Sequence, residues 1–241
     1  MIRTVNLRKE FGKNVAVCNL NLEIPKGEFF SLVGPNAAGK TTTIKMLVGL
    51  LKPTSGEIFI GGENISENYV EAKRLISYVP DVPFLYDKLT AKEFLRFVGD
   101  IYGIDRKKQE VVSEELLEKF GLKDEKETLI ENYSHGMKQR LVFCAAFLHE
   151  PQVIIVDEPM VGLDPIAIKL VKDSLKEKSR KGVTIFMSTH TLAICEEISD
   201  RIGIINEGKL ITLGTVDEIR KMTGTVSGGL EALFLKLIGK D

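Results

Sequence analysis

The chain has 241 residues, of which 44% are apolar and 28% charged, and its formal net charge is -1. This length suits one large domain or two closely joined ones. No basic excess indicates a nucleic-acid partner, and no acidic block indicates a disordered tail. The N-terminus lacks the apolar stretch of a signal peptide, and no run approaches the roughly 18 apolar residues of a membrane-spanning helix. A function at a membrane would therefore require another chain to supply the membrane-spanning part.

The cysteines and histidines show no pairing or metal-binding pattern. Cys18, Cys144 and Cys195 are far apart and form no CxxC pair. We interpret them as reduced cytosolic thiols. His135, His149 and His190 likewise lack the spacing of metal ligands.

The first part of the chain favours short strands and one helix. Residues 15–24 alternate apolar and polar side chains, a turn follows at 25–27, and residues 28–33 form an apolar strand. A helix is expected to begin at Lys40 and to bury one apolar face. That face comprises Ile44, Met46, Leu47 and Leu50. After the turn at 53–56, residues 57–60 form a further strand.

The middle of the chain favours helices. Thr90 and Glu93 have the spacing of a capping box in front of an apolar, helically spaced run that Gly103 ends. Asp105 is expected to cap the next helix, which Gly121 ends, and a third helix spans about 135–148. Residues 87–149 thus form a helical block between strand-rich parts.

Strands and helices alternate again after residue 150. Apolar strands are expected at 153–156, 183–187 and 201–206, and Pro165 suits the first turn of a helix. This alternation favours an α/β fold whose parallel sheet is covered on both faces. Glu207 and Gly208 suit a hairpin turn into a strand at 209–212, and the tail from 217 to 241 is expected to be helical.

A glycine-rich segment fits the phosphate-binding pattern GxxxxGK followed by Ser or Thr. Its residues are Gly34, Pro35, Asn36, Ala37, Ala38, Gly39, Lys40 and Thr41. It lies between a strand and a helix, the context in which backbone N–H groups and a helix N-terminus face an anion. Lys40 can reach the β- and γ-phosphates of a nucleotide, and the Thr41 hydroxyl can ligate Mg²⁺. The alternative is a chance glycine-rich turn.

Polar residues also end two of the later strands. Asp157 and Glu158 follow the apolar strand at 153–156, and His190 follows the strand at 183–187. Because ligands bind beyond the carboxyl ends of parallel strands, Asp157 is expected to hold Mg²⁺ and Glu158 to orient or deprotonate water. His190 is expected to sense the γ-phosphate. The alternatives are a solvated pair that caps the strand and a purely structural histidine.

Together these motifs resemble the ATP-binding cassette family over nearly the whole chain. Phe11 resembles the aromatic that stacks on adenine, Asp81 stands where the family has its Q-loop glutamine, and 34–42, through Thr42, resemble the Walker A loop. Residues 134–139 (SHGMKQ) resemble the signature, 153–158 Walker B, 162–164 the D-loop and His190 the switch histidine. The Walker A and signature segments are similar to the branch that exports drugs, lipids or polysaccharides.

The resemblance implies a particular fold and assembly. A RecA-like core with an N-terminal antiparallel β subdomain comprises 1–86 and 150–241, and the helical subdomain with the signature comprises 87–149. Two subunits, identical or homologous, sandwich two ATP molecules. Ser134 and Gly136 then bind the γ-phosphate held by the partner's phosphate loop.

Three residues depart from the family pattern. Ala37 replaces a glycine, a change that the loop can tolerate if φ there is negative. His135 replaces the first signature glycine and either adds a pH-dependent charge near phosphate or points to solvent. Asp81 replaces glutamine; a carboxylate can still ligate Mg²⁺ but cannot donate hydrogen bonds.

We therefore predict an ATPase that uses ATP and Mg²⁺ and powers an integral membrane permease, with export the expected direction. The chain would lie at the cytoplasmic face of the cell membrane. The permease would contact residues 79–86, where Pro80, Pro83 and Phe84 to Tyr86 supply rigid and apolar surface, unless these pack internally. Two alternatives are a soluble cassette ATPase without a transport role, such as one serving cluster assembly, and a nucleotide-binding regulator without hydrolysis. The cargo is not indicated.

Overall fold

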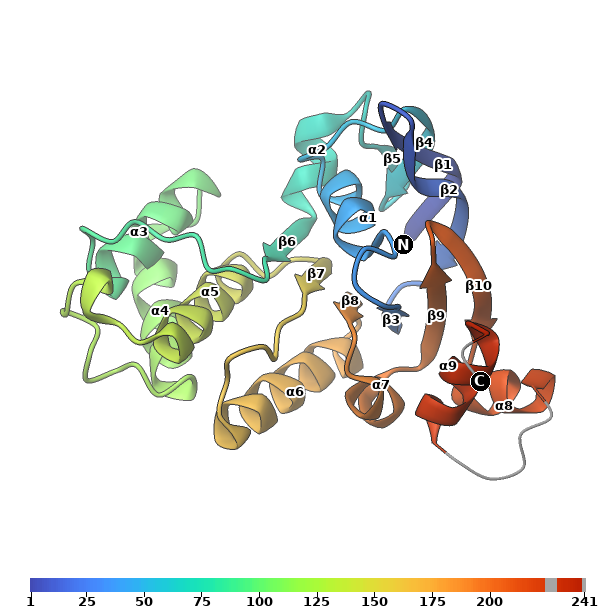
Figure 1. The fold of residues 1–241 in the computed structure, drawn as a ribbon. Coiled ribbons are helices and arrows are strands. Elements are labelled where there is room, and N and C mark those ends of the chain that lie inside the picture. Colours follow the sequence, from blue (N-terminus) through green and yellow to red (C-terminus); the bar gives the residue numbers. More distant parts are fainter. Residues whose placement is uncertain (224–228, 240–241) are drawn as a thin grey trace.

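The computed structural model describes residues 1–223 and 229–239 and contains two sheets and several helices (Figure 1). The strands are β1 (Ile2–Phe11), β2 (Asn14–Ile24), β3 (Phe29–Val33), β4 (Ser55–Ile60), β5 (Glu63–Asn64), β6 (Ile76–Val79), β7 (Val153–Asp157), β8 (Thr184–Thr189), β9 (Arg201–Asn206) and β10 (Lys209–Gly214). The helices are α1 (Lys40–Leu47), α2 (Tyr69–Arg74), α3 (Ala91–Ile101), α4 (Arg106–Lys119), α5 (His135–Leu148), α6 (Pro165–Arg180), α7 (Leu192–Ile198), α8 (Val216–Thr223) and α9 (Leu230–Leu237), with a 3-10 turn η1 (Ile130–Asn132).

The smaller sheet is antiparallel and has the strand order β2-β1-β4-β5. The alternation seen in the sequence places Leu20, Leu22 and Ile24 of β2 in the core and leaves the residues between them facing solvent. In Figure 1 this sheet forms one end of the molecule, beside α1 and α2. The predicted antiparallel β subdomain is confirmed.

The larger sheet has the order β10-β9-β3-β8-β7-β6, and its pairs from β9 to β6 are parallel. Along β7, Val153 and Ile155 belong to the core shared with α1 and the antiparallel sheet. Ile154 and Val156 belong instead to the core shared with α5 and α6. Because successive side chains of a strand point to opposite faces, a continuously apolar strand is buried on both sides.

The helical block packs α3, α4 and α5 together at the far end of the molecule (Figure 1). The expected capping box is present: Thr90 Oγ1 accepts from the Glu93 N–H at 3.2 Å, and Glu93 Oε2 accepts from the Thr90 N–H at 2.8 Å. Asp105 caps α4, as predicted. Phe120, Phe143 and Phe147 form the aromatic centre of this region.

One expectation about local structure is wrong, and another can be compared with the structure only in part. Leu50 lies after α1 and is 62% exposed, because the helix ends at Leu47 and the chain turns away before Leu50 can face the core. The helical tail is described as α8 and α9, whereas the part of that prediction falling on 224–228 and 240–241 lies outside the described residues. Within the described chain, none of the helices has both the length and the apolarity needed to span a membrane.

Candidate active site

The phosphate-binding pattern forms a loop between β3 and α1, as its sequence context predicts. Gly39 is the N-cap of α1 and supplies no side-chain hydrogen bond, so the first N–H groups of the helix remain available. These groups carry the partial positive charge of the helix N-terminus. The loop is therefore suited to bind an anion.

Gly39 is required by both conformation and space. Its φ is +106°, and a Cβ atom there would overlap the carbonyl oxygen of Ala16. The hairpin between β9 and β10 supports the loop from the same side, because the Gly208 N–H donates to the Ala38 carbonyl at 3.0 Å. The Cys18 N–H in turn donates to the Gly208 carbonyl at 2.8 Å. Two segments distant in sequence, β2 and the β9–β10 hairpin, thus hold the loop.

Ala37 does not have the negative φ under which we expected it to be tolerated. Its φ is +63°, in the left-handed region where a Cβ atom costs roughly 1–2 kcal/mol. The bonds that hold the neighbouring Ala38 and Gly39 dictate the path of the loop, so Ala37 adopts a glycine-like conformation. The loop therefore carries backbone strain at this residue.

Lys40 lies buried at the start of α1, and its charge is held inside the loop. Its Nζ atom donates to the carbonyl oxygens of Gly34 at 2.8 Å and Pro35 at 3.1 Å. The same nitrogen lies 3.7 Å from Oε1 of Glu158. The structure thus brings together two residues that the sequence separates by more than a hundred positions.

Glu158 and His190 meet at the carboxyl ends of β7 and β8. Glu158 Oε2 lies 2.9 Å from His190 Nδ1 and accepts from the His190 backbone N–H at 3.3 Å. Glu158 also has a positive φ of +46°, an uncommon conformation for a glutamate. The carboxylate is thereby held between Lys40 and His190.

Asp157 has the features of a ligand for a hard cation. The residue is fully buried, its Oδ1 accepts from the Ser188 hydroxyl, and its Oδ2 has no hydrogen-bond partner among the described residues. Burial raises the pKa of its carboxyl group, while the nearby hydroxyl groups of Ser188 and Thr41 oppose that rise. An orphaned carboxylate oxygen beside a threonine hydroxyl fits Mg²⁺.

Asp81 reaches the same region from the segment after β6. It lines the cleft beside Thr41 and Glu158, and its Oδ1 accepts from the Val82 N–H at 2.9 Å. Over residues 1–223 and 229–239, no three His, Cys, Asp or Glu side chains are grouped closely enough to hold a metal by themselves. A metal here would therefore also need ligands from a nucleotide or water.

An open cleft of about 690 Å³ runs over the phosphate loop. It is lined by Phe11, Asn14, Val15, Ala16, Asn36, Ala37, Ala38, Gly39, Lys40, Thr41, Thr42, Asp81, Glu158 and Glu207. Four expected site residues are not among these lining residues but contact the site: Gly34 and Pro35 accept hydrogen bonds from Lys40, Asp157 accepts one from Ser188, and His190 contacts Glu158. The cleft has the dimensions of a small-molecule site.

Phe11 is 51% exposed at one end of this cleft. The Lys9 ammonium lies 5.1 Å from the centre of its ring, so one aromatic face already has a cationic neighbour. A half-exposed ring at the mouth of a phosphate-binding cleft suits stacking with a planar base.

Ser134 and Gly136 lie elsewhere, at the exposed N-terminus of α5. Ser134 is the N-cap, and its Oγ accepts from the Met137 N–H at 3.2 Å. Neither residue belongs to the described lining of the cleft. His135 is exposed, and a Cβ added to Gly162 would lie 2.8 Å from its Cδ2 atom. The ring therefore covers the D-loop glycine rather than pointing freely to solvent.

Several residues of the site gave no recognisable signal in the sequence. Asn14, Val15, Ala16 and Glu207 line the cleft, and Ser188 bonds to Asp157. They belong to no motif. The positions of the lining residues depend on the packing of β2 and the β9–β10 hairpin against the loop, and that of Ser188 depends on the pairing of β8 with β7. Only the turn at Glu207 and Gly208 was indicated, and the turn pattern says nothing about a binding role.

The described geometry, with its phosphate loop, buried lysine and acidic strand end, is that of a P-loop nucleotide hydrolase. Residues 17–161 match the family described as ABC transporter. A bacitracin transport ATP-binding protein of Bacillus licheniformis is 42% identical over 222 residues, which are 92% of this chain and 72% of that protein. The linearmycin resistance ATP-binding protein of Bacillus subtilis (strain 168) is 37% identical over 98% of this chain and 78% of its own.

Solved structures of similar chains share the fold. A structure described as the ATP-binding subunit of an ABC transporter has a TM-score of 0.94 and 34% identity, and 99% of each chain is covered. A dimeric ATP-binding cassette in a post-hydrolysis state, bound to ADP and Pi, has a TM-score of 0.82 and 24% identity over 89% of this chain and 98% of that one, which shows the shared fold alone. The chain belongs to the ABC transporter family and is an ATP-binding subunit with ATPase activity.

Proposed function

We propose that two copies of this chain, or this chain and a homologue, close around two ATP molecules and that the cycle of closing and opening powers export by a separate membrane subunit. One observation carries the proposal. Lys40, Glu158 and His190 converge within one chain, whereas Ser134 and Gly136 stand apart at an exposed helix N-terminus. A second subunit can present that helix N-terminus to the nucleotide from the opposite side.

Each residue of the cleft has a distinct part in this proposal. Phe11 stacks on the adenine, residues 34–42 donate backbone N–H groups to the phosphates, and Lys40 neutralises the β- and γ-phosphates. Thr41, Asp157 and Asp81 would hold Mg²⁺, which would supply positive charge to the phosphates. Glu158 takes the proton of the attacking water, and His190 orients Glu158 through the 2.9 Å contact.

The proposed partner surface is the start of the helical region. Ser134 keeps its cap with Met137 by accepting one hydrogen bond, so its O–H proton remains available to a phosphate. Gly136 leaves the approach open, because a Cβ there would meet only the Leu163 side chain at 3.8 Å. We also propose that 87–149 form a helical subdomain, because α3, α4 and α5 pack on one another, and that 1–86 with 150–241 form the core.

The segment after β6 suits contact with a membrane subunit. Leu85 packs on the core, but Val82, Phe84 and Tyr86 remain exposed, and Tyr86 meets Phe97 with ring centres 5.4 Å apart. The expected internal packing therefore applies only in part. A contiguous exposed aromatic patch favours a protein partner, here a permease helix at the cytoplasmic face of the membrane.

Export is favoured by the relatives. The two proteins compared above are named for bacitracin transport and linearmycin resistance, and both names concern antibiotics. A transporter confers resistance to a compound by carrying that compound out of the cell. We therefore propose a compound of the antibiotic type as the cargo class, recognised by the membrane subunit rather than by this chain.

The dimer can be tested by light scattering. Glu158→Gln keeps the shape of the side chain but removes the proton acceptor, so we expect ATP binding to persist, turnover to fall by about 100-fold or more, and the variant to dimerise with ATP. Charge-assisted hydrogen bonds contribute about 1.5–3 kcal/mol each, so two shared nucleotides can shift association by several powers of ten. Adding Gly136→Asp places a carboxylate against phosphate and should restore the monomer.

The control adds the same charge away from the proposed interface. Val111 is 58% exposed on α4, and Glu158→Gln with Val111→Asp should still dimerise. A dimer that survives Gly136→Asp would show that the α5 N-terminus does not face the partner's nucleotide. Turnover by Glu158→Gln near the wild-type rate would remove Glu158 from the catalytic role.

A further inference from the structure

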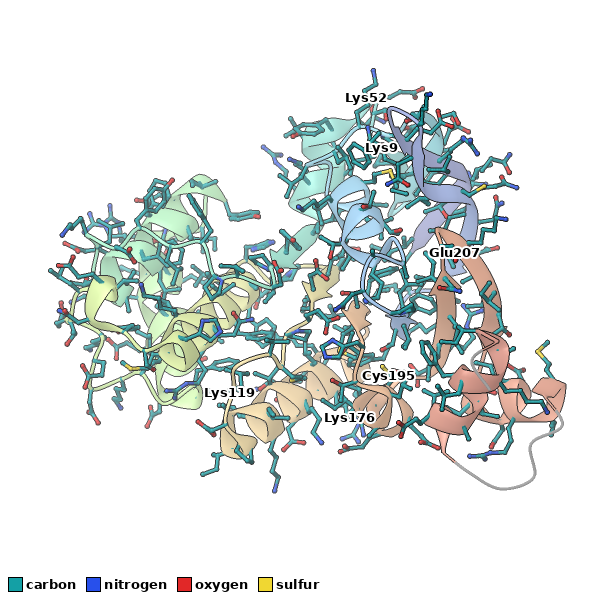
Figure 2. All side chains as sticks on the ribbon, in the orientation of Figure 1. Lys9, Lys52, Lys119, Lys176, Cys195 and Glu207 are labelled. Carbon is teal, nitrogen blue, oxygen red and sulfur yellow. The ribbon has the colours of Figure 1, made fainter. Side chains whose placement is uncertain are left out.

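The turn between β9 and β10 places a carboxylate in the cleft that no motif explains. Glu207 and Gly208 form the turn, and Glu207 is one of the residues that line the cleft over the phosphate loop. Figure 2 labels Glu207 at the tip of this hairpin. Within residues 1–223 and 229–239, the Glu207 side chain makes no hydrogen bond or ion pair.

The backbone holds Glu207 at a fixed position. Gly208 is buried and bonded on both sides, to Ala38 of the phosphate loop and to Cys18 of β2. Both turn residues have positive φ, +48° at Glu207 and +74° at Gly208. Such turns favour Asn or Asp followed by Gly, and a longer side chain in this conformation is under strain. A strained, unpaired side chain in a cleft is a candidate for binding.

The location along the cleft identifies the part of the nucleotide that Glu207 meets. A Cβ on Gly208 would lie 2.8 Å from the Ala16 carbonyl oxygen, and one on Gly39 would lie 3.5 Å from Gly208 Cα. The hairpin tip therefore lies beside both the phosphate loop and the Ala16 segment, and the chain before Ala16 leads toward Phe11 at the other end of the lining. In an extended nucleotide, the ribose lies between the base and the phosphates.

Chemistry restricts the group that Glu207 can bind. An ionised carboxylate only accepts hydrogen bonds, so it repels phosphate and attracts O–H or N–H donors. The ribose 2′- and 3′-hydroxyls are the donors at this level of the nucleotide, and a carboxylate on a ribose diol is a recurring arrangement in nucleotide-binding folds.

We propose that Glu207 accepts hydrogen bonds from the ribose hydroxyls and makes the site selective for ribonucleotides over deoxyribonucleotides. The inference rests on the proposed nucleotide site but is separate from dimerisation and transport. Glu207 positions the nucleoside and takes no part in the hydrolytic step.

The test compares nucleotides that differ in one hydroxyl. Calorimetric titration with ADP, 2′-deoxyADP and 3′-deoxyADP avoids turnover and leaves the diphosphate unchanged. Wild-type protein should bind ADP about tenfold more tightly than at least one deoxy analogue, which corresponds to about 1.4 kcal/mol. In Glu207→Gln that ratio should fall to about two or less. Because the diphosphate is common to all three, its repulsion by the carboxylate cancels in the ratio.

Two further measurements make the outcomes distinct. Glu67→Gln removes an exposed carboxylate that does not line the cleft and should keep the wild-type ratio.

Inosine diphosphate tests whether Glu207 binds the base, because it replaces the amine of the base by a carbonyl group. If Glu207→Gln instead removes a preference for ADP over inosine diphosphate, the carboxylate binds the base and the ribose assignment is wrong. Equal binding of ADP and both deoxy analogues by wild-type protein would also overturn it. Failure of the wild type to bind any of the nucleotides would instead contradict the nucleotide site itself.

Discussion

Two helix N-termini of this chain are built in opposite ways. At α1, Gly39 offers no side-chain cap, and Lys40 is buried beneath the loop. At α5, Ser134 caps its own helix and is exposed. The first terminus leaves its N–H groups to a ligand, whereas the second satisfies one of them internally and keeps a hydroxyl proton to donate.

This difference supports the proposal that the α1 terminus binds the nucleotide by itself and that the α5 terminus acts on a nucleotide already bound to a partner. The α1 terminus combines free N–H groups, a cation and an adjoining cleft within one chain. The cations near the α5 terminus are bonded differently: Lys138 donates to Asp87 at 2.8 Å, and Arg140 donates to the carbonyl oxygens of Phe120 at 2.7 Å and Gly136 at 3.3 Å. We infer that affinity resides in the core and that the helical region contributes once the nucleotide is bound.

The largest expected effect comes from removing the cation of the α1 terminus. Lys40→Ala should weaken ATP binding by more than about 100-fold, because a buried charge-assisted contact to the β- and γ-phosphates is lost. Lys45→Ala removes an exposed lysine from the same helix and should leave binding unchanged. Calorimetric titration with ATP and Mg²⁺ measures both. If Lys40→Ala still binds ATP, the contrast between the two helix N-termini is wrong, because the affinity would not depend on the cation at the α1 terminus.

A smaller effect is expected at the metal. If Asp81 ligates Mg²⁺, Asp81→Asn should raise the Mg²⁺ concentration for half-maximal turnover by roughly fivefold, which corresponds to about 1 kcal/mol. Asp124→Asn removes an exposed carboxylate of the helical region and serves as the control. An unchanged requirement would mean that Asp81 does not touch the metal, and its part could then lie in coupling to the partner.

Strain in the loop predicts an effect on stability. Ala37→Gly should raise the free energy of unfolding by about 0.5–1 kcal/mol, because glycine adopts φ near +63° without a Cβ penalty. For a chain of this size, the melting temperature should rise by about 1–4 °C. Ala38→Gly is the matched control and should lower it, since Ala38 is buried and has no positive φ. A fall of both variants would mean that the loop relaxes around Ala37 without strain.

The smallest effect concerns the link between the two regions. Lys119 of α4, labelled in Figure 2, donates to Glu177 of α6 at 2.7 Å, and Lys181 donates to the same carboxylate at 2.6 Å. Lys119 is the main cause that lowers the pKa of Glu177 from 4.5 to about 2. Because the pair is partly exposed, Glu177→Gln should cost less than about 1 kcal/mol of unfolding free energy at neutral pH.

The pH dependence of this cost follows from the direction of the shift. The folded state holds the Glu177 proton less tightly than the unfolded state, so the contribution is present above about pH 4.5 and is lost as the pH falls toward 2. Urea unfolding of wild type and Glu177→Gln at several pH values measures the difference, with Glu67→Gln as control. A difference that persists at pH 2 would exclude the ion pair as its source.

Much of the local structure was determined by the sequence itself. The phosphate loop, the caps at Thr90 and Asp105, and the bounds of α5 and β9 agree with the predictions. These features depend on residues three or four positions apart or on a short apolar run, so neighbouring side chains suffice to specify them. The order of the motifs along the chain then indicated the family.

Only the tertiary structure decided how the site is assembled. The φ of Ala37, the exposure of Leu50, the contact of His135 with Gly162 and the place of Glu207 in the cleft depend on segments far apart in the chain. Lys40 meets Glu158 because β3, β8 and β7 are adjacent in one sheet and end at the same edge. Strand order of this kind is set by packing of the whole core, and no local pattern encodes it.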